Sequence, residues 1–512
     1  MENSRTHNVI RNISWAIPLQ VVLMLLQFVA RTFFVRQLGR EYLGINGLFT
    51  DIICVLDLAN LRIPDAIIIS MYKPLAEKNN EKVRALLYLI GKAYSIIGLV
   101  VMGIGLLLIP LLPVLIKDPP DIPVNFTIIY LFYLFQAVFT YYISYRKSIV
   151  FADQKNYIIT IYQNIINFIR IILQIVILIT IRNFYLFLAA QVICILAGNF
   201  LISRKAERMY PFIKEKNNYK LSKDDIAEII SNIKSMFIIG IGFVTLEGID
   251  SILVSSIIGI GILGLCSNYI LIIISVKTLI EQALNGFTAS IGNLNAKEDM
   301  QTIEKTFYEF FFIVFFIFAF CAINLAVSLN TLITNWFGNS FLLSQAIVIT
   351  LVLRFYIQGT QYVTYTFRST LGLLKKRRFI PLVSAFVNIT LSVLLGRFYG
   401  AVGIFLASSI AVFFFTILPE AQLIYKEKFG KSIFKFIFIY LGYLLFIVGN
   451  YFITNMLLNN FTFTGWIGFL AKASLGAFIS GLLFIIVFFK NRNFRSICSR
   501  LLYIIKSRRN LS

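Results

Sequence analysis

The chain has 512 residues, of which 58% are hydrophobic and only 14% are charged, with a formal net charge of +23. Soluble globular chains carry roughly 25% charged residues, so this composition excludes an ordinary soluble protein. The single histidine, His7, lies in the polar N-terminus, and the five cysteines are widely scattered without a CxxC pair. Histidine-based metal sites and Ser-His-Asp catalysis are therefore excluded, and no cofactor is expected.

The apolar residues come in blocks about 20 long, which matches the span of a bilayer core. They predict an all-α polytopic membrane protein whose first helix is an uncleaved anchor. Pro110 and Pro113 predict an irregular outer end for the third helix. The 14 predicted spans are 11–35, 42–71, 86–116, 125–145, 157–180, 184–203, 236–258, 262–285, 306–328, 341–367, 379–396, 400–424, 436–457 and 464–489.

The spans divide into five segments along the chain. We expect an N-terminal lobe over residues 1–203, a cytoplasmic linker over 204–235, and a C-terminal lobe over 236–424. Ser222 followed by Asp225 predicts a helix start within the linker, leading into a short helix at the membrane surface. Helices 13 and 14 occupy 425–489, and the basic tail 490–512 is either an amphipathic helix on anionic lipid or a solvated end.

The distribution of Lys and Arg predicts the orientation in the membrane. With both termini cytoplasmic, 35 of the 47 basic residues lie in inner segments and only five lie in outer loops. The net charge is therefore mostly a signal of topology, and it need not mean a nucleic-acid partner.

Two pairs of segments indicate that the lobes are internal repeats. LGREYLGINGL at 38–48 matches IGIGILGLCSN at 258–268, which aligns Gly39 with Gly259. YRKSIVFADQKNY at 145–157 matches FRSTLGLLKKRRF at 367–379, which aligns Arg146 with Arg368. The offsets, 220 and 222, are nearly equal. They predict two six-helix lobes in the same orientation around a central cavity, with helices 13 and 14 outside the repeat.

Several bases fall inside the predicted spans, where each charge at the bilayer centre costs about 2.5–3.5 kcal/mol. Such charges pair with one another or line a wet cavity. Arginine binds phosphate oxygens through two donors, so a cluster of cations suits an anionic headgroup. Lys92 and Lys472 favour peripheral roles. The candidates for headgroup binding are Arg31, Arg170, Lys277 and Arg354. The alternative role for each of them is a salt bridge between helices.

Acidic residues also lie within the spans. Asp57 is central in the second span, and Glu247 and Asp250 share a helix face at i,i+3. This like-charged pair needs a nearby cation or a raised pKa. It is therefore a candidate H⁺ or Na⁺ coupling site, or else it pairs with a base such as Arg31 or Arg354. Lys277 and Glu281, at i,i+4, form a possible structural pair.

The second span contains a break in its helical pattern. Pro64 frees the carbonyl of Asn60 and predicts a kink, and Arg62 and Asp65 share a face at i,i+3. Broken helices are tolerated where they face protein or a wet cavity. The segment is either a kinked helix with an internal Arg62–Asp65 pair or a hinge that faces the cavity.

The run FVARTFFVRQLGREYLGINGLFTDI, followed by MYKPLAEKN, resembles the Wzx-type polysaccharide-biosynthesis flippases of the multidrug/oligosaccharidyl-lipid/polysaccharide (MOP) exporter superfamily. RKSIVFADQKNY, FRSTLGLLKKRRF and LGRFYGAVGIFLASS also resemble segments of that family. The second span departs from the family pattern, because Asn60, Arg62 and Pro64 replace a glutamate and flexible glycines.

The resemblance implies two six-helix lobes, a V-shaped cavity and alternating access in a bacterial cytoplasmic membrane. The implied cargo is an undecaprenyl-pyrophosphate-linked oligosaccharide, moved from the inner to the outer leaflet for capsular or exopolysaccharide synthesis. Arg31 matches an arginine of the related lipid II flippases, and cavity cations are expected to meet the pyrophosphate. Membrane lipids, a polysaccharide polymerase and glycosyltransferases are implied partners, and the membrane potential is a further possible driving force.

Three alternatives remain open at the level of the sequence. A multidrug or cation antiporter of the same superfamily favours an acidic cavity, whereas this chain has many bases in its spans. A membrane enzyme such as a polymerase needs a sizeable external loop, but the outer segment LNTLITNWFGNS is short and uncharged. A relative that no longer transports is compatible with the changes in the second span.

Overall fold

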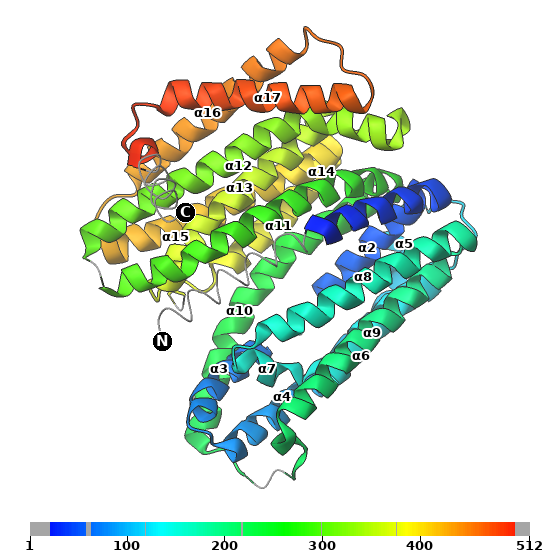
Figure 1. Cartoon of the computed structure of the whole chain (residues 1–512), viewed down its shortest axis with the longest axis vertical. Coiled ribbons are helices and arrows are strands. Elements are labelled where there is room, and N and C mark those ends of the chain that lie inside the picture. The colour runs from blue at the N-terminus through cyan, green and yellow to red at the C-terminus, as the bar shows by residue number, and fades with distance from the viewer. Residues whose placement is uncertain are drawn as a thin grey trace, which may run out of the picture. The chain divides into compact units, whose positions relative to one another are not determined.

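The computed structural model describes residues 21–57, 63–117, 119–216, 219–297, 299–374 and 376–496. Over these residues all regular structure is helical (Figure 1). Eleven helices of this part of the chain are long and apolar enough to cross a membrane, which confirms a multi-pass membrane protein. The chain divides into two compact units, Met1–Gly264 and Leu265–Ser512. The domain boundaries expected from the sequence stay a prediction.

The first unit begins with the helix Val21–Leu38. The described part of the predicted second span consists of the end of α2 and the start of α3, and residues 58–62 lie outside the described part. Pro110 and Pro113 lie in short turns beyond α4, as predicted for the outer end of that span. The elements that follow are α2 Arg40–Leu56, α3 Ile63–Ala76, α4 Asn80–Leu108, η2 Ile109–Leu111, α5 Leu112–Leu115, α6 Phe126–Ser144, α7 Lys147–Ala152, α8 Asn156–Thr180, α9 Phe184–Met209, η3 Pro211–Lys214, α10 Lys223–Leu253 and η4 Val254–Ile258.

The predicted start of a helix in the linker is present, but the helix is not short. Ser222 Oγ accepts a hydrogen bond from the Asp225 amide at 3.0 Å, and Asp225 Oδ2 accepts one from the Ser222 amide at 3.3 Å. This capping box opens α10, which continues for 31 residues to Leu253. The helix continues past its charged first turns into the apolar run that begins at Met236, so the expected short helix is the first part of a longer one.

The second unit contains the remaining helices. The predicted spans 379–396 and 400–424 meet at Gly400, whose φ of 60° and ψ of −140° break the helix. The chain folds back there, as two hydrogen bonds between the two arms show. Ser408 Oγ donates to Asn388 Oδ1 at 3.2 Å, and Ser384 Oγ donates to the Ala411 carbonyl at 3.0 Å. The elements are α11 Ile260–Lys297, α12 Met300–Phe337, η5 Asn339–Phe341, α13 Gln345–Thr370, α14 Ile380–Val412, η6 Phe413–Ile417, α15 Leu418–Ile424, η7 Tyr425–Phe429, α16 Phe434–Leu458 and α17 Gly465–Phe488.

The internal repeat is visible in the backbone. Gly39 and Gly259, aligned in sequence, both have positive φ, at 95° and 134°, and each directly precedes a helix. A Cβ added to Gly44 would lie 2.3 Å from the Ile260 carbonyl oxygen, and one added to Gly264 would lie 2.2 Å from that of Arg40. These contacts are reciprocal at the sequence offset of 220. The starts of α2 and α11 therefore cross as equivalent elements.

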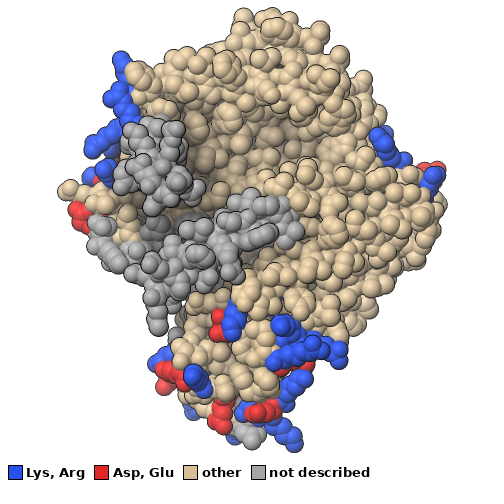
Figure 2. Space-filling view, viewed as in Figure 1, with Lys and Arg blue, Asp and Glu red and all other residues tan. Residues whose placement is uncertain are grey.

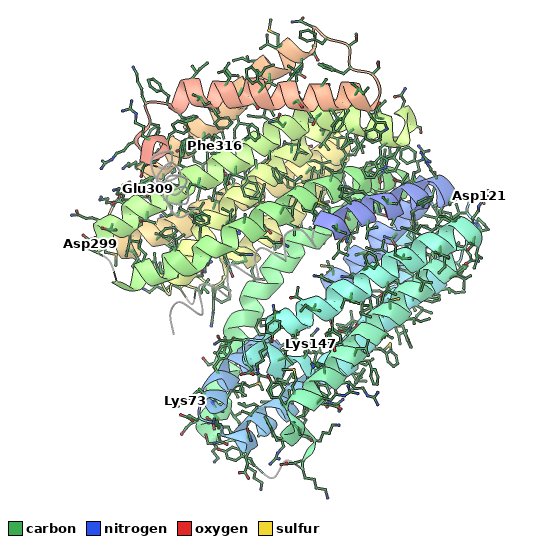
Figure 3. All side chains as sticks on the ribbon, viewed as in Figure 1. Lys73, Asp121, Lys147, Asp299, Glu309 and Phe316 are labelled. Atoms are coloured by element: carbon green, nitrogen blue, oxygen red, sulfur yellow. The ribbon has the colours of Figure 1, made fainter. Side chains whose placement is uncertain are left out.

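Charged residues of the first unit lie at its two ends, and more of them are visible at the end that holds Lys73 (Figure 2). Lys73, in α3, lies at the opposite end of this unit from Asp121, which belongs to a predicted outer loop (Figure 3). The space-filling view shows blue and red side chains together near the lower end and a broad uncharged surface above them (Figure 2). This pattern is typical of helices whose middle portion lies in lipid.

Candidate functional site

The predicted headgroup ligands are distributed over both units. Arg31, on the first helix, and Arg170, on α8, belong to the first unit, and Lys277, on α11, and Arg354, on α13, belong to the second. Arg31 and Arg170 are each half-buried.

Arg170 lies among polar groups from three other helices. Its charge interacts with the hydroxyl of Tyr133 on α6 and the thiol of Cys194 on α9. The Tyr133 hydroxyl donates in turn to Asn46 Oδ1 on α2, at 2.5 Å. Arg170 Nε is buried without a hydrogen-bond partner within the described structure. An unsatisfied donor at a partly buried cation is costly, so Arg170 Nε is a candidate donor to an anion.

A row of amides extends this cluster along the same helices. Gln136 lies three residues after Tyr133, Gln174 four after Arg170, and Gln191 three before Cys194, which places each on the same face as its neighbour. Gln191 Nε2 donates to Gln136 Oε1 at 3.1 Å, and Gln174 Nε2 donates to the Phe187 carbonyl at 3.4 Å. Together with Asn46, Tyr133, Arg170 and Cys194 they form what we call the α6–α8–α9 polar cluster.

The charge-based reading of the sequence missed the uncharged members of this cluster. Asn46, Tyr133, Gln136, Gln174 and Gln191 carry no charge, so a search for ionised residues passes over them. A signal was nevertheless present, because polar residues recur at helical spacing on three apolar spans.

In the second unit, Lys277 and Arg354 have different surroundings. Lys277 Nζ lies 3.9 Å from Glu281 Oε1, which is the i,i+4 pair expected from the spacing. The Arg354 guanidinium lies 6.0 Å from the ring centroid of Phe405 on α14, at a distance typical of a cation–π contact. Both bases thus have structural neighbours, and their role in headgroup binding stays a prediction.

The acids expected to couple transport to an ion are only partly described. Asp57 ends α2 and interacts electrostatically with Lys147, at the start of α7. Figure 3 shows Lys147 between the ends of the first unit marked by Lys73 and Asp121. Asp250, on α10, is almost fully buried at 1% exposure. The side chain of Glu247 lies outside the described part.

The predicted hinge lies mostly outside the described residues. Arg62 falls in the segment 58–62, and the side chain of Asp65 is likewise outside the described part, so the Arg62–Asp65 pair stays a prediction. Pro64 is buried in the first turn of α3. The described helices end and begin on either side of the predicted break.

A second arrangement occurs at corresponding positions of the two units. In each, an arginine at the end of the fourth helix of the repeat pairs with a glutamate near the end of the sixth. Arg146 Nη1 lies 2.8 Å from Glu207 Oε1, and Arg368 Nη1 lies 3.0 Å from Glu420 Oε1. The sequence aligned the two arginines but not the two glutamates. These pairs stabilise the connections at the ends of the helices.

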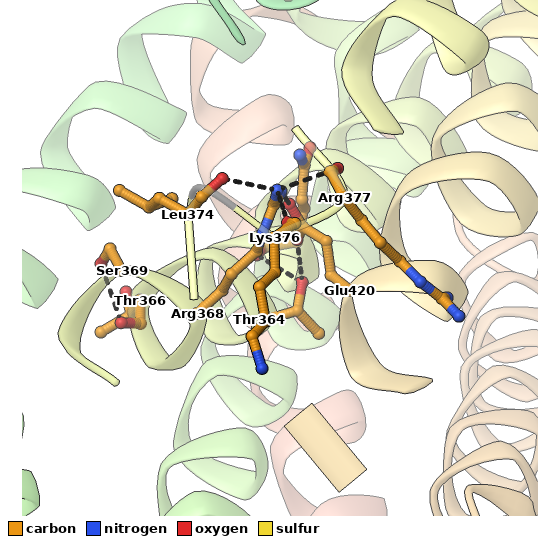
Figure 4. A network of polar contacts seen from close by, with 9 residues as sticks. Thr364, Thr366, Arg368, Ser369, Leu374, Lys376, Arg377 and Glu420 are labelled. Atoms are coloured by element: carbon orange, nitrogen blue, oxygen red, sulfur yellow. Dashed lines mark hydrogen bonds and ion pairs between the residues drawn. The ribbon is translucent and has the colours of Figure 1, made fainter. Parts of the chain in front are cut away.

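The pair in the second unit is surrounded by further hydrogen bonds (Figure 4). Thr364 Oγ1 donates to Glu420 Oε2 at 2.7 Å. Arg368 Nη2 donates to three carbonyls of the loop before α14, those of Leu374, Lys376 and Arg377, at 3.1–3.2 Å. Both charged side chains are at most 1% exposed. Arg368 therefore holds the loop before α14 in place through three backbone carbonyls.

Within the described ranges, no three His, Cys, Asp or Glu side chains come together as a metal site requires. No protein-family model matches the sequence, and no curated protein matches it either.

Solved structures define the class of fold. The chain is similar to an inward-facing multidrug resistance MATE family transporter of the MOP superfamily, with a TM-score of 0.59 and 12% identity, over 80% of this chain and 97% of that one. It is similar to the Vibrio cholerae MATE transporter VcmN, with a TM-score of 0.57 and 14% identity, over 82% and 96%. The fold is therefore that of MOP superfamily transporters, in agreement with the predicted architecture.

A lipid flippase shares the same fold. The chain is similar to the lipid II flippase MurJ in an inward closed conformation, with a TM-score of 0.67 and 15% identity. The similarity covers 92% of this chain and 98% of that one, so it includes more of the chain than the similarity to the two MATE structures does. The TM-scores and the coverage establish the fold. At such low sequence identity they do not identify the substrate.

Proposed function

We propose that this protein is a flippase for lipid-linked oligosaccharides. Its cargo is an undecaprenyl-pyrophosphate-linked repeat unit, carried from the inner to the outer leaflet of a bacterial cytoplasmic membrane by alternating access. The polymer made from it is a capsular or extracellular polysaccharide. Both termini are cytoplasmic in this proposal, and a polymerase and glycosyltransferases act before or after transport.

The observation that carries this proposal is the polar cluster around Arg170. A cation in an apolar span, with a buried unpartnered Nε and uncharged donors beside it, suits a pyrophosphate and its attached sugars. Amides and hydroxyls bind sugar hydroxyls, and arginine binds phosphate oxygens. The likeness to a lipid II flippase over 92% of the chain supports the same class of cargo.

Arg31, Lys277 and Arg354 take part in headgroup binding in this proposal. Asp57, Glu247 and Asp250 are the candidate groups for coupling to H⁺ or Na⁺. An inside-negative membrane potential also favours outward movement of an anionic headgroup. The segment with Arg62, Pro64 and Asp65 acts as a hinge of the N-terminal lobe.

Complementation of a deletion strain tests the headgroup role. Arg170→Ala and Arg31→Ala should abolish polymer export while protein levels in the membrane stay normal, because each removes a cation from an apolar span. Lys92→Ala is the matched control, since Lys92 is exposed on α4 and should leave export unchanged. Full export by both arginine variants would contradict the anion-binding site.

A cation-coupled multidrug antiporter is the second candidate. It is favoured by the likeness to two MATE structures and by the buried carboxyl of Asp250. In the same deletion strain, this function predicts raised sensitivity to cationic drugs, reversed by the wild-type gene and not by Asp250→Asn. Unchanged drug sensitivity together with lost polymer export would favour the flippase.

A further inference from the structure

The second unit contains a basic pocket that the proposed transport path does not use. It has a volume of about 390 Å³ and lies where α12 and α16 begin and where the chain continues after α17. We call it the α12–α16 pocket. Its lining includes Glu304, Lys305, Tyr308, Lys431, Lys435 and Arg492.

The lining carries a surplus of positive charge. Four bases face two acids, Glu304 and Glu309, which leaves a net charge of +2. Lys431 Nζ already binds Glu304 Oε2 at 2.6 Å, and Glu309 Oε1 accepts from Ser496 Oγ at 3.1 Å. The other three bases have no carboxylate within 4.0 Å in the part of the chain that the structure describes, and they are Lys305, Lys435 and Arg492.

Neighbouring contacts hold this pocket in shape. The Lys435 ammonium lies 4.4 Å from the centroid of the Tyr308 ring. Asn493 Nδ2, beyond α17, donates to the Tyr308 carbonyl at 3.4 Å. Figure 3 shows Glu309 near the same end of α12 as Asp299, with Phe316 farther along the helix. Tyr308 therefore joins α12 to both α16 and the segment after α17.

The position of the pocket indicates a ligand that sits at a membrane surface. The distribution of Lys and Arg predicts that this end of the helices is cytoplasmic. Phe434 and Phe438, one turn apart on α16, and Phe489, at the end of α17, are exposed beside the basic residues. Exposed aromatic side chains next to cations are typical of the boundary between headgroups and acyl chains.

We propose that the α12–α16 pocket binds the phosphate of an anionic phospholipid headgroup from the inner leaflet. Lys305 and Lys435 supply point charges, and Arg492 binds phosphate oxygens through two donors. The acyl chains lie along the exposed faces of α16 and α17. Bound in this way, the lipid fastens the two helices outside the repeat to α12. The site is separate from the headgroup site around Arg170.

A titration of the purified full-length protein in detergent tests this site. Phosphatidylglycerol should raise the thermal midpoint, and phosphatidylcholine should not. In the variant Lys305→Gln/Lys435→Gln/Arg492→Gln, the phosphatidylglycerol concentration at half effect should rise at least about tenfold, because basic residues near a membrane surface add to lipid affinity. The matched control Lys426→Gln/Lys428→Gln/Lys490→Gln removes the same charge outside the pocket lining and should titrate like the wild type.

Three outcomes would overturn the proposal. An equal loss in the control variant would mean general surface attraction. An equal midpoint shift with glycerol phosphate would mean that the pocket takes a soluble phosphate. No difference between phosphatidylglycerol and phosphatidylcholine on the wild type would mean that no anionic site exists. The single variant Lys305→Gln, at an exposed position, must also weaken the phosphatidylglycerol effect, so the test does not depend on the triple variant folding.

Discussion

The two units use aligned arginines in different ways. Arg146 and Glu207 remain 39% and 16% exposed, and a second base, Lys214, lies 3.2 Å from the same glutamate. Arg368 and Glu420 are almost completely buried, and the arginine also binds three carbonyls. The same end of the first unit holds a further part-buried pair, Lys82 with Asp225 at 2.8 Å. Arg146 with Glu207 is therefore a partly exposed pair, whereas the aligned Arg368 with Glu420 is the centre of a buried network.

Glu420→Ala should have the largest effect. It leaves the Arg368 charge buried without its partner, and breaking such a pair typically costs about 3–5 kcal/mol. We expect a strong fall in the thermal midpoint of the purified protein or loss of folded protein from the membrane. A midpoint within error of the wild type would contradict the buried network.

Replacing both partners sharpens this comparison. The double variant Arg368→Met/Glu420→Leu removes both charges, and apolar substitutes for a buried pair are often neutral or stabilising. The three loop carbonyls lose their donor, so some cost of about 1–3 kcal/mol remains. The double variant should be more stable than Glu420→Ala, as measured by thermal unfolding in the same detergent. A less stable double variant would mean that the loop contacts outweigh the ion pair.

The glycine crossing tests where the two copies are equivalent. An added Cβ at Gly44 or at Gly264 meets a carbonyl oxygen at 2.2–2.3 Å, so each alanine variant must push α2 and the start of α11 apart. We expect each to lose about 1–3 kcal/mol, the usual range for overpacking. Gly103→Ala is the control, because a Cβ there meets nothing within 4 Å. Unequal losses of stability in the two alanine variants would contradict the equivalence of the contacts at Gly44 and Gly264.

Arg146→Ala should have a small effect. Exposed ion pairs contribute about 0–1 kcal/mol, and Lys214 remains beside Glu207 in the variant. Thermal unfolding should place it close to the wild type and far from Glu420→Ala. A loss as large as that of Glu420→Ala would mean that the two pairs are equivalent in energy as well as in position.

The smallest effect is expected from acidification at Asp225. The hydrogen bond from Lys82, followed by that from Ser222, lowers the pKa of Asp225 below its usual value. A carboxyl with a lowered folded-state pKa stabilises the protein above its unfolded-state pKa, and the contribution is lost as pH falls through the folded-state value. We expect a loss on the order of a few tenths of a kcal/mol below pH 4. The thermal midpoint of Asp225→Asn should not show this loss at low pH. A pH profile identical to that of the wild type would contradict the stabilising role of the Asp225 carboxylate.

The sequence predicted much of this fold because lipid imposes strict rules. Apolar blocks and the aligned Gly39 and Gly259 reflect constraints on the backbone in a membrane. The orientation expected from the bias in Lys and Arg stays a prediction. The glutamates that pair with Arg146 and Arg368 could not be predicted from the sequence offset between the two repeats. Glu207 and Glu420 are 213 positions apart, unlike the aligned arginines at 222, mainly because the helices between arginine and glutamate are shorter in the second unit. Residues 181–183 form a connection in the first unit, whereas the second unit turns at Gly400.

The candidate site was predicted less completely. Arg170 could be found because an arginine in an apolar span is rare, but its neighbours could not be ranked from sequence. Tyr133, Gln174 and Gln191 become informative only when three helices bring them to one place. Asp57 was expected to be a cavity acid from its central position. The fold places Lys147, at the start of α7, near it, which spacing along one helix does not reveal.

Reconstitution tests the central claim most directly. The purified protein in liposomes should make an undecaprenyl-pyrophosphate-linked oligosaccharide on the inner leaflet accessible to an enzyme added outside. Arg170→Ala should leave this accessibility at the level of empty liposomes, and Lys92→Ala should match the wild type. Wild-type protein that is folded in the liposomes yet gives no more access than empty liposomes would contradict the flippase. Transport by Arg170→Ala at the wild-type rate would contradict the role of the polar cluster.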